Sequence, residues 1–554
     1  MFMLSTYKAS NHTRKVISIK FVWSMLSFIK FSTFGSLLNL TSGGKYFGEN
    51  QDLAAKISTS SKFICVDNEK GDFSTSKEQK LEVEWYDLDE DNPHNWSLLK
   101  KSLVSLELCF LTMLVYMGSA IYTPGADLLM NDFGISLRVS LIPLTVFVVG
   151  YGIGTLLFSP LSENKVIGRN YVYFVTLFLF FIMQLPVALA KNIASLSVLR
   201  FLTGIFASPA LANVGASFTD IFAPPYMPIG LGIWGIAAWC GPSIGPFLGS
   251  ILVVKGGWRW CFWFMFISSG GCFLMLTFLL PETYRDSILY RKSRSLKSTM
   301  QEDGSNFQEA KNFPNIISLI KETLWRPIVI SIEEPVVLLI NIYIALVYSV
   351  VYLWFEAFPI VFLQVHHFTL VEMGTAYLSI IIGVLVGITF YLIYCYKCFT
   401  KKLLAGEKVD PEVFLPPAIF ASILMPISLF IFGWTTAKDI HWIGPLIGAA
   451  IFGASGILNF QTLLNYLGMS FPRYVASVFA SNNLFRSVIA GVFPLFARSL
   501  YLNLSTERFP VAWGSSILGF ISTLMCSIPV LFYLNGPRLR ARSRFSGLGH
   551  RSRN

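Results

Sequence analysis

Between residues 235 and 249 the chain reads Gly235-Ile236-Ala237-Ala238-Trp239-Cys240-Gly241-Pro242-Ser243-Ile244-Gly245-Pro246-Phe247-Leu248-Gly249. This stretch lies inside a longer run, 228–254, that contains no charged residue. A helix of roughly 20 apolar residues crosses the hydrocarbon core of a bilayer. Small residues at helical spacing let a neighbouring helix approach closely, and proline is tolerated where neighbouring helices satisfy the freed backbone groups. The stretch therefore predicts a membrane-embedded helix that is bent and packed tightly against another.

The composition of the whole chain agrees with that environment. Of 554 residues, 54% are hydrophobic and 14% are charged, and the mean hydropathy is +0.58. Soluble domains carry about 25% charged residues, enough to cover their surface. A soluble enzyme is therefore nearly excluded, and lipid is the solvent for most of the chain.

Eleven further runs are long and apolar enough to cross a bilayer, and segments of alternating barrel strands are missing. The twelve expected spans are 102–124, 140–162, 171–190, 195–218, 228–254, 259–281, 335–362, 374–396, 414–434, 440–463, 473–497 and 513–534. They form two sets of six on either side of a polar segment. The predicted fold is an all-α membrane protein with twelve transmembrane helices in two six-helix bundles.

The distribution of Lys and Arg predicts the orientation, because loops on the cytosolic side are enriched in both. With the N-terminus in the cytosol, the inner loops and C-terminal tail hold 21 Lys and Arg and the outer loops hold 7. We therefore expect both termini in the cytosol. The expected parts are a partly disordered cytosolic tail (1–100), the first bundle (101–281), a cytosolic linker (282–334), the second bundle (335–534) and a basic cytosolic tail (535–554).

The segment 16–40 is apolar and aromatic but is interrupted by Lys20 and Lys30. A thirteenth span would upset the orientation, and the segment lacks the small-residue cleavage site of a signal peptide. We interpret it as an amphipathic segment at the membrane surface, or as the result of a start codon placed too far upstream, in preference to a crossing.

The loop after the second span runs from Ser159 to Asn170 and contains Glu163, Gly168 and Arg169. It resembles the signature between helices 2 and 3 of the major facilitator superfamily, an acidic residue followed by Gly-Arg. Ser159 replaces the first glycine of that signature, and two extra residues separate Glu163 from Gly168. A carboxylate and a guanidinium here can hold the cytosolic face closed through charge-assisted hydrogen bonds, although an ordinary basic inner loop explains the residues equally well.

Arg200 begins a second stretch, Arg200-Phe201-Leu202-Thr203-Gly204, that looks like another superfamily signature. An arginine inside a span should face a cavity or a carboxylate. Glu107 is the nearest candidate partner by depth, and the alternative is that Arg200 reaches toward the outer interface. Glu107 and Glu356 are the expected protonatable carboxylates, and together with Arg200 they are the candidates for proton coupling.

The opening stretch resembles the signature of the superfamily's antiporters at Gly235, Gly241, Pro242, Gly245 and Gly249. Close packing alone would also explain these small residues. Weaker marks are Asn92-Pro93-His94-Asn95-Trp96, Trp258-Arg259-Trp260, Trp263 and Pro281-Glu282-Thr283-Tyr284. Together they are similar to the fungal twelve-helix drug:proton antiporters of the benomyl, fluconazole and caffeine resistance type, over residues 85–540.

This resemblance implies proton-coupled export of amphipathic xenobiotics across the plasma membrane by rocking of the two bundles, in a protein that we expect to be monomeric. The alternative is a transporter of a specific metabolite such as a polyamine. Polar side chains within spans are expensive against lipid and should line a substrate cavity. The candidates are Gln184, Asn213, Asn459, Gln461, Asn465, Asn482, Asn483 and Arg486.

Other function classes find little support in the residues. The net charge of +11 comes from basic residues that flank apolar spans, which favours a membrane surface over nucleic acid. The sequence contains no nucleotide-binding loop of the type that cradles ATP phosphates. The eight cysteines fall mostly inside apolar spans and form no metal-binding pattern. We therefore expect no cofactor, no metal and no enzymatic activity. An intramembrane His or Asp cluster would favour an enzyme, and a long cytosolic domain would favour a sensor; both are missing.

Overall fold

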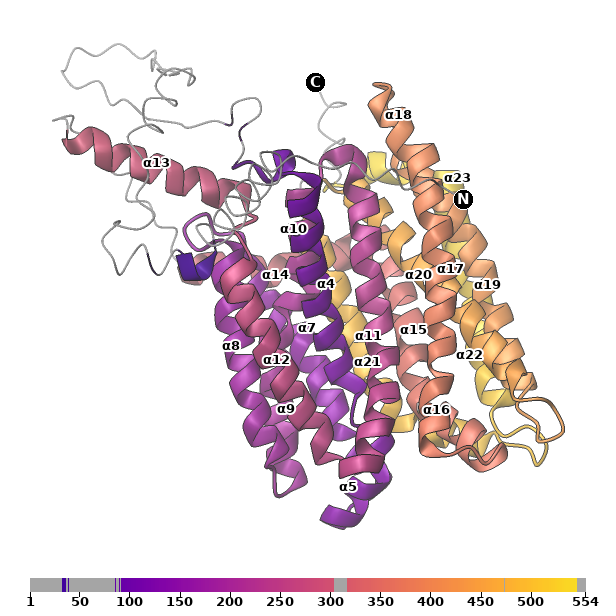
Figure 1. Cartoon of the computed structure of the whole chain (residues 1–554). Coiled ribbons are helices and arrows are strands. Elements are labelled where there is room, and N and C mark those ends of the chain that lie inside the picture. Colours follow the sequence, from indigo (N-terminus) through magenta and orange to yellow (C-terminus); the bar gives the residue numbers. More distant parts are fainter. Residues whose placement is uncertain are drawn as a thin grey trace, which may run out of the picture.

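The computed structural model describes residues 32–35, 38, 85, 89, 91–302, 316–472 and 474–545 (Figure 1). Most of the predicted N-terminal tail and residues 546–554 of the predicted C-terminal tail lie outside these residues. Within the described part, twelve helices are long and apolar enough to cross a membrane. The predicted all-helical fold with twelve spans is confirmed.

The first bundle contains six spans built from α4 to α12. Its helices are α4 (Leu98–Ala120) with α5 (Ala126–Phe133), α6 (Leu137–Ser140) with α7 (Ile142–Ser162), α8 (Gly168–Ala188), α9 (Ile193–Ala207) with α10 (Pro209–Ile221), α11 (Met227–Gly256) and α12 (Arg259–Leu279). Short 3-10 turns precede α4, α5 and α11 at Pro93–Asn95, Thr123–Gly125 and Pro224–Tyr226. These helices occupy the indigo-to-magenta side of Figure 1.

The second bundle repeats the pattern from α15 to α23. Its helices are α15 (Pro335–Phe358) with a π-helical turn (Pro359–Val365), α16 (Leu370–Ala376) with α17 (Leu378–Cys395), a second π-helical turn (Tyr396–Thr400) and α18 (Lys401–Leu404), α19 (Leu415–Trp434) after a 3-10 turn (Pro411–Phe414), α20 (Ile443–Ser470), α21 (Val475–Asn503), and α22 (Ala512–Met525) with α23 (Ser527–Arg542).

Two spans continue past the polar ends that the sequence predicts. The apolar pattern predicts ends at 463 and 497, whereas α20 continues to Ser470 and α21 to Asn503. Asn465 and Tyr466 on α20 and Tyr501 on α21 are buried in the protein, so these helices continue past the apolar runs that the sequence shows.

Two helices of the linker lie at one end of the bundles, which we call the linker face: α13 (Arg285–Glu302) and α14 (Ile316–Glu333). In Figure 1, α13 projects away from the first bundle at this end. Lys292 of α13 ties the chain before α4 to the linker face, because its Nζ lies 2.9 Å from Asp89 Oδ2 and 2.8 Å from Asp91 Oδ2. Burial alone would lower the pKa of Lys292, but these two carboxylates raise it.

A small described part of the segment 16–40 also contacts the linker face. The Thr33 hydroxyl donates to Asn170 Oδ1 at 2.8 Å, and the Phe34 ring lies 4.9 Å from that of Phe278 between centroids. These contacts join the segment to α8 and α12. Its interpretation as a membrane-surface segment stays a prediction.

The two bundles meet along α7 with α21 and along α11 with α16, α17 and α20. Within the first bundle, α11 also packs along α4. The helix of the opening sequence stretch therefore lies between its own bundle and the other one, and Figure 1 shows it beside α17.

Candidate functional site

Arg486 of α21 is the centre of a polar cluster between the two bundles. Only 3% of its surface is exposed, and it donates from Nη2 to Tyr116 Oη of α4 at 2.9 Å and to Asn483 Oδ1. Its guanidinium carbon lies 4.6 Å from the Tyr348 ring centroid and 5.1 Å from that of Phe460. A buried guanidinium thus has hydroxyl, amide and aromatic neighbours, with contacts to both bundles.

Four tyrosines, which we call the tyrosine cluster, surround this arginine: Tyr116, Tyr151, Tyr348 and Tyr352. The Tyr151 hydroxyl lies 3.3 Å from those of both Tyr348 and Tyr352, across the boundary between α7 and α15. Asn483 joins α21 to α7 by donating to Thr155 Oγ1 at 2.9 Å. Hydrogen bonds from neutral groups therefore connect the bundles at their centre.

Arg200 of α9 lies at the other end of this cluster. It is 1% exposed, donates from Nη2 to the Ser119 carbonyl at 3.1 Å, and stacks over the Phe147 ring at 4.0 Å. Ser119 Oγ in turn lies 3.2 Å from the Tyr352 hydroxyl. Arg200 thus lies in the interior with a backbone carbonyl as its partner where the sequence predicted a cavity or a carboxylate, and the alternative that it reaches the outer interface is wrong.

The pairing of Arg200 with Glu107 that depth suggested is also wrong. Ser119, which binds Arg200, follows Glu107 by twelve residues on α4, or about 18 Å along the helix axis. Glu107 is buried near Cys272 of α12, and its Oε1 has no hydrogen-bond partner among the described residues. The sequence suggested a similar depth because each residue was counted from the start of its own helix. The helices α4 and α9 run in opposite directions, so the two counts begin at opposite faces of the protein.

Glu356 of α15 lies closer to Arg200. Tyr122 is in electrostatic contact with both Arg200 and Glu356, and Arg200 lies 5.7 Å from the Tyr122 ring. Asp127 and Arg498 are also within electrostatic range of Glu356. Of the two expected carboxylates, Glu356 is the one that shares a neighbour, Tyr122, with Arg200.

Two of the remaining cavity candidates join the bundles near the linker face. Gln461 of α20 donates to the Leu231 carbonyl of α11 at 3.0 Å, and Asn465 donates to the Tyr391 hydroxyl at 2.9 Å. Tyr391 then donates to the Pro228 carbonyl of α11 at 3.1 Å. These side chains hold α17 and α20 against α11.

The other candidates are spread through the bundles. Asn482 donates to Asn341 of α15 at 3.0 Å. Gln184, Asn213 and Asn459 are buried, and their amide groups have no hydrogen-bond partner among the described residues. No contact in the described part of the chain places these three in the cluster around Arg486. Of the eight predicted cavity residues, Asn483 and Arg486 are the two that this cluster contains.

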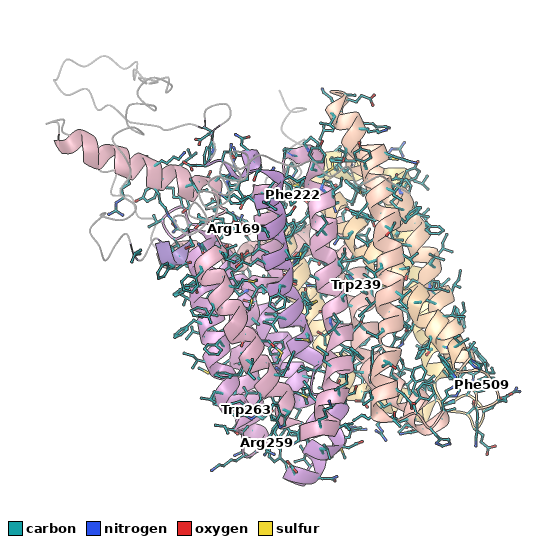
Figure 2. The ribbon with its side chains drawn as sticks, viewed as in Figure 1. Arg169, Phe222, Trp239, Arg259, Trp263 and Phe509 are labelled. Carbon is teal, nitrogen blue, oxygen red and sulfur yellow. The ribbon has the colours of Figure 1, made fainter. Side chains whose placement is uncertain are left out.

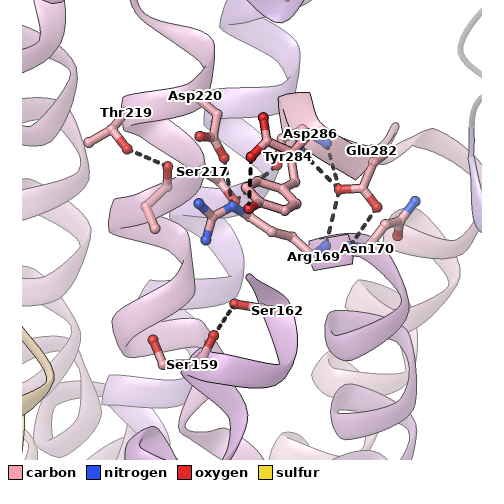
Figure 3. A network of polar contacts seen from close by, with 12 residues as sticks. Ser159, Ser162, Arg169, Asn170, Ser217, Thr219, Asp220, Glu282, Tyr284 and Asp286 are labelled. Carbon is pink, nitrogen blue, oxygen red and sulfur yellow. Dashed lines mark hydrogen bonds and ion pairs between the residues drawn. The ribbon is translucent and has the colours of Figure 1, made fainter. Parts of the chain in front are cut away.

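A second, separate network lies at the linker face around Arg169 (Figures 2 and 3). Arg169 Nε lies 2.6 Å from Asp220 Oδ2 at the end of α10, and the guanidinium lies 5.3 Å from the Tyr284 ring. Burial raises the pKa of Glu163, and the nearby Arg169 opposes that shift. A carboxylate–guanidinium pair is present, but the partner of Arg169 is Asp220 and not Glu163. Both residues belong to the first bundle, so this pair connects α8 to α10 and does not join the two bundles.

Glu282 completes this network by capping the start of α8. Its Oε1 accepts from the backbone nitrogens of Arg169, Thr283 and Tyr284 at 3.0–3.1 Å, and its Oε2 lies 3.3 Å from Arg291 Nη2. A carboxylate at a helix N-terminus is favoured by the unpaired N–H groups and the helix dipole. Gly168 has φ of +77°, and any side chain there would collide with this carboxylate.

The glycines of α11 allow the close approach that the sequence predicts. A Cβ at Gly241 would lie 2.5 Å from Tyr116 Cβ, and one at Gly245 would lie 2.8 Å from the Met117 carbonyl oxygen. Gly249 would meet the Ile121 carbonyl in the same way, and Gly235 would meet Gln461 of the second bundle. Gly241 therefore positions α4 and, through Tyr116, the cluster around Arg486.

Residues 108–494 match the family model of the Major Facilitator Superfamily. The chain belongs to the major facilitator superfamily. The match covers both bundles, and it includes the loop of Arg169, Arg200 and the glycines of α11.

Named fungal relatives within the superfamily are close. The chain is 50% identical to the "Cycloheximide resistance protein" of Candida maltosa, over 94% of this chain and all of that protein. It is 39% identical to "Fluconazole resistance protein 1" of Saccharomyces cerevisiae, over 87% of this chain and 88% of the relative. The similarity to fungal drug resistance transporters that the sequence motifs indicated is confirmed.

Solved superfamily structures share the fold at low sequence identity. A partially occluded inward-open conformation of the Escherichia coli xylose transporter XylE superposes with a TM-score of 0.54 at 15% identity, covering 79% of this chain and 98% of XylE. The human organic anion transporter MFSD10 superposes with a TM-score of 0.53 at 15% identity, covering 78% of this chain and all of MFSD10. At this identity the likeness shows the fold alone.

Sequence reasoning missed the four residues of the tyrosine cluster in this superfamily member. Tyrosines in spans are most often read as interfacial, since they are enriched at membrane–water interfaces. Tyr348 and Tyr352 lie in the middle of a span and share one helix face at a spacing of four residues, which was the signal available. Asp220, the partner of Arg169, lay inside an expected loop, so nothing in the sequence joined the two.

Proposed function

We propose that this protein exports amphipathic drugs from the cytosol by proton-coupled alternating access at the plasma membrane, with both termini and the linker face in the cytosol. The observation that carries the proposal is the 50% identity, over 94% of the chain, to a protein named for cycloheximide resistance. The excess of Lys and Arg on the linker side supports the orientation.

The cluster around Arg486 supports the assignment of the substrate site to the boundary of the bundles. Its contacts join α4 and α7 of the first bundle to α15 and α21 of the second. When the bundles separate at one face of the membrane or the other, the side chains of the cluster must exchange hydrogen-bond partners. Hydroxyl, amide and guanidinium groups among aromatic rings suit amphipathic molecules that accept hydrogen bonds and present a flat apolar face. Transport would proceed as a monomer, since both bundles of one chain form this cluster.

The same cluster argues against the polyamine alternative. Arg200 and Arg486 are both buried near the boundary, and no carboxylate hydrogen-bonds to either within the described residues. Like charges repel more strongly in a low-dielectric interior than in water. A polycation would meet this repulsion on entering, whereas a neutral amphipathic substrate would not.

Proton coupling would rest on Arg200 and Glu356, with Tyr122 between them. Arg200 stays charged at any relevant pH, and a carboxylate that faces it across the boundary changes its proton affinity when the bundles move. Glu107 lies away from this pair and is the weaker candidate.

A resistance assay in a yeast strain that lacks its own efflux pumps tests the proposal. Expression should raise tolerance to cycloheximide and fluconazole, and efflux from energised vesicles should stop when a protonophore collapses the pH gradient. Arg200→Ala should bind drug without exporting it, while Arg200→Lys keeps part of the activity because the charge remains. Efflux that persists without the pH gradient would remove the proton-coupled mechanism.

A further inference from the structure

The described end of the chain, Ser543–Phe545, folds back onto the linker face after α23. Ser543 Oγ donates to Glu334 Oε1 at 2.7 Å, and the Arg544 backbone nitrogen donates to the same oxygen at 3.2 Å. The Phe545 ring lies 5.3 Å from that of Tyr474 in an edge-to-face contact. Three consecutive residues therefore dock through a hydroxyl, a backbone amide and an aromatic ring.

This docking site is the junction of the linker with the second bundle. Glu334 immediately precedes α15, and Tyr474 immediately precedes α21. Arg326 of α14 lies 5.9 Å from the Tyr474 ring. Since α14 also packs on α7 of the first bundle, the docked tail covers a junction that connects the two halves.

The sequence around Ser543 has the charge pattern of a kinase substrate. It reads Arg540-Ala541-Arg542-Ser543-Arg544. Guanidinium groups just before a serine bind the acidic substrate grooves of arginine-directed protein kinases, whose specificity is read from such charges. In the docked state Arg540 is paired with Glu412 of the 3-10 turn before α19, so the kinase binds the molecules in which this pair and the last turn of α23 have opened.

We propose that Ser543 is a phosphorylation site whose modification releases the tail from Glu334. An arginine-directed serine kinase would transfer the γ-phosphoryl group of ATP to Ser543 Oγ. The Oγ–P bond forms, the bond from the γ-phosphorus to the bridging oxygen breaks, and ADP leaves. The hydroxyl proton passes to the catalytic carboxylate of the kinase. This inference goes beyond the proposed export function and needs no drug transport, but it rests on the cytosolic position of the linker face that is proposed with that function.

Two physical effects drive the release. The hydroxyl that donates to Glu334 becomes a phosphate that carries about −1.5 to −2 charges and offers acceptor oxygens. A carboxylate and a phosphate held this closely repel each other. Ser543 is 7% exposed when docked, so the kinase acts on the fraction of molecules whose tail is released, and the phosphate then keeps that fraction released.

Hydrogen exchange on the full-length protein in lipid nanodiscs tests the proposal, because the Arg544 amide donates to Glu334 in the docked tail and loses this acceptor on release. The protein is treated with the catalytic subunit of cAMP-dependent protein kinase and Mg-ATP. We expect incorporation at Ser543 that Ser543→Ala abolishes. Exchange at the Arg544 amide should rise about tenfold on phosphorylation and in Ser543→Glu.

Matched variants separate the effect of position from that of charge. Ala541→Glu adds the same charge two residues earlier at an exposed position and should leave exchange unchanged. Glu334→Gln should slow exchange again in the Ser543→Glu background, because the acceptor remains and the repulsion is gone. Equal labelling of wild type and Ser543→Ala, equal exchange in Ser543→Glu and Ala541→Glu, or no rescue by Glu334→Gln would overturn the proposal. These readouts need no drug transport, so they stay separable from the proposed function.

Discussion

Two buried arginines show opposite ways of holding a charge inside this protein. Arg169 at the linker face pairs with a carboxylate, Asp220, and its helix is capped by another, Glu282. Arg486 between the bundles binds a tyrosine hydroxyl and an asparagine amide and stacks on aromatic rings. A charge paired with an opposite charge within one bundle locks that bundle together. A charge held by neutral groups from both bundles can change partners when the bundles move. We propose that this difference separates the structural site around Arg169 from a transporting site around Arg486.

The largest expected effect is that of Arg486→Ala, which removes the guanidinium from the boundary between the bundles. Efflux should fall by about 100-fold, equivalent to about 2.7 kcal/mol, while the protein remains in the membrane. Arg508→Ala is the control, because Arg508 is exposed and its partner Asp439 is exposed as well; efflux there should stay within about twofold of wild type. If Arg486→Ala lowers the amount of protein in the membrane and leaves the efflux per protein unchanged, the residue has a structural role.

Arg169→Ala should act on stability first. It leaves Asp220 buried without its partner, and breaking a buried ion pair costs about 3–5 kcal/mol, so abundance and thermal stability in detergent should drop. The double variant Arg169→Met/Asp220→Leu should recover most of both, because no uncompensated charge remains. If efflux also returns in the double variant, the Arg169–Asp220 pair has a structural role only. If stability returns without efflux, the pair is itself needed for transport, and the contrast with Arg486 is wrong.

Gly241→Leu connects the two regions through packing. The first added carbon already lies 2.5 Å from Tyr116 Cβ, so α4 must shift and carry the Arg486 partner with it. Overpacking costs about 1–3 kcal/mol, and we expect export from protein that still reaches the membrane to fall more than in Tyr116→Phe and less than in Arg486→Ala. Gly215→Ala serves as the control, since its Cβ would meet the Trp234 ring at an ordinary 3.6 Å. Normal efflux by Gly241→Leu would contradict the role of this approach.

The smallest expected effect is that of Tyr116→Phe, which removes one acceptor and keeps the ring. Arg486 retains Asn483, so the loss of one hydrogen bond to a charged group should lower efflux by about tenfold. Tyr501→Phe on α21 is matched, because Tyr501 is equally buried and its hydroxyl has no partner among the described residues. Equal efflux rates in the two variants would remove Tyr116 from the site.

The sequence predicted some of these features well, for physical reasons. Apolar length alone located the twelve spans, and the glycines of α11 correctly predicted a close helix contact, because both signals are local. The sequence did not show that Arg200 binds Ser119 and not Glu107, since the relative height of residues on antiparallel helices depends on where each helix starts. It also did not join Arg169 to Asp220 or assemble the tyrosine cluster, because those contacts come from packing between helices distant in the chain.

One measurement tests the central claim most directly: simultaneous recording of drug and proton movement in proteoliposomes that contain purified wild type, Arg486→Ala or Arg169→Met/Asp220→Leu, under an imposed pH gradient. The account predicts that wild type and the double variant move drug and protons together, and that Arg486→Ala moves both about 100-fold more slowly. Coupled transport at the wild-type rate by Arg486→Ala, with transport lost from a stable double variant, would contradict it.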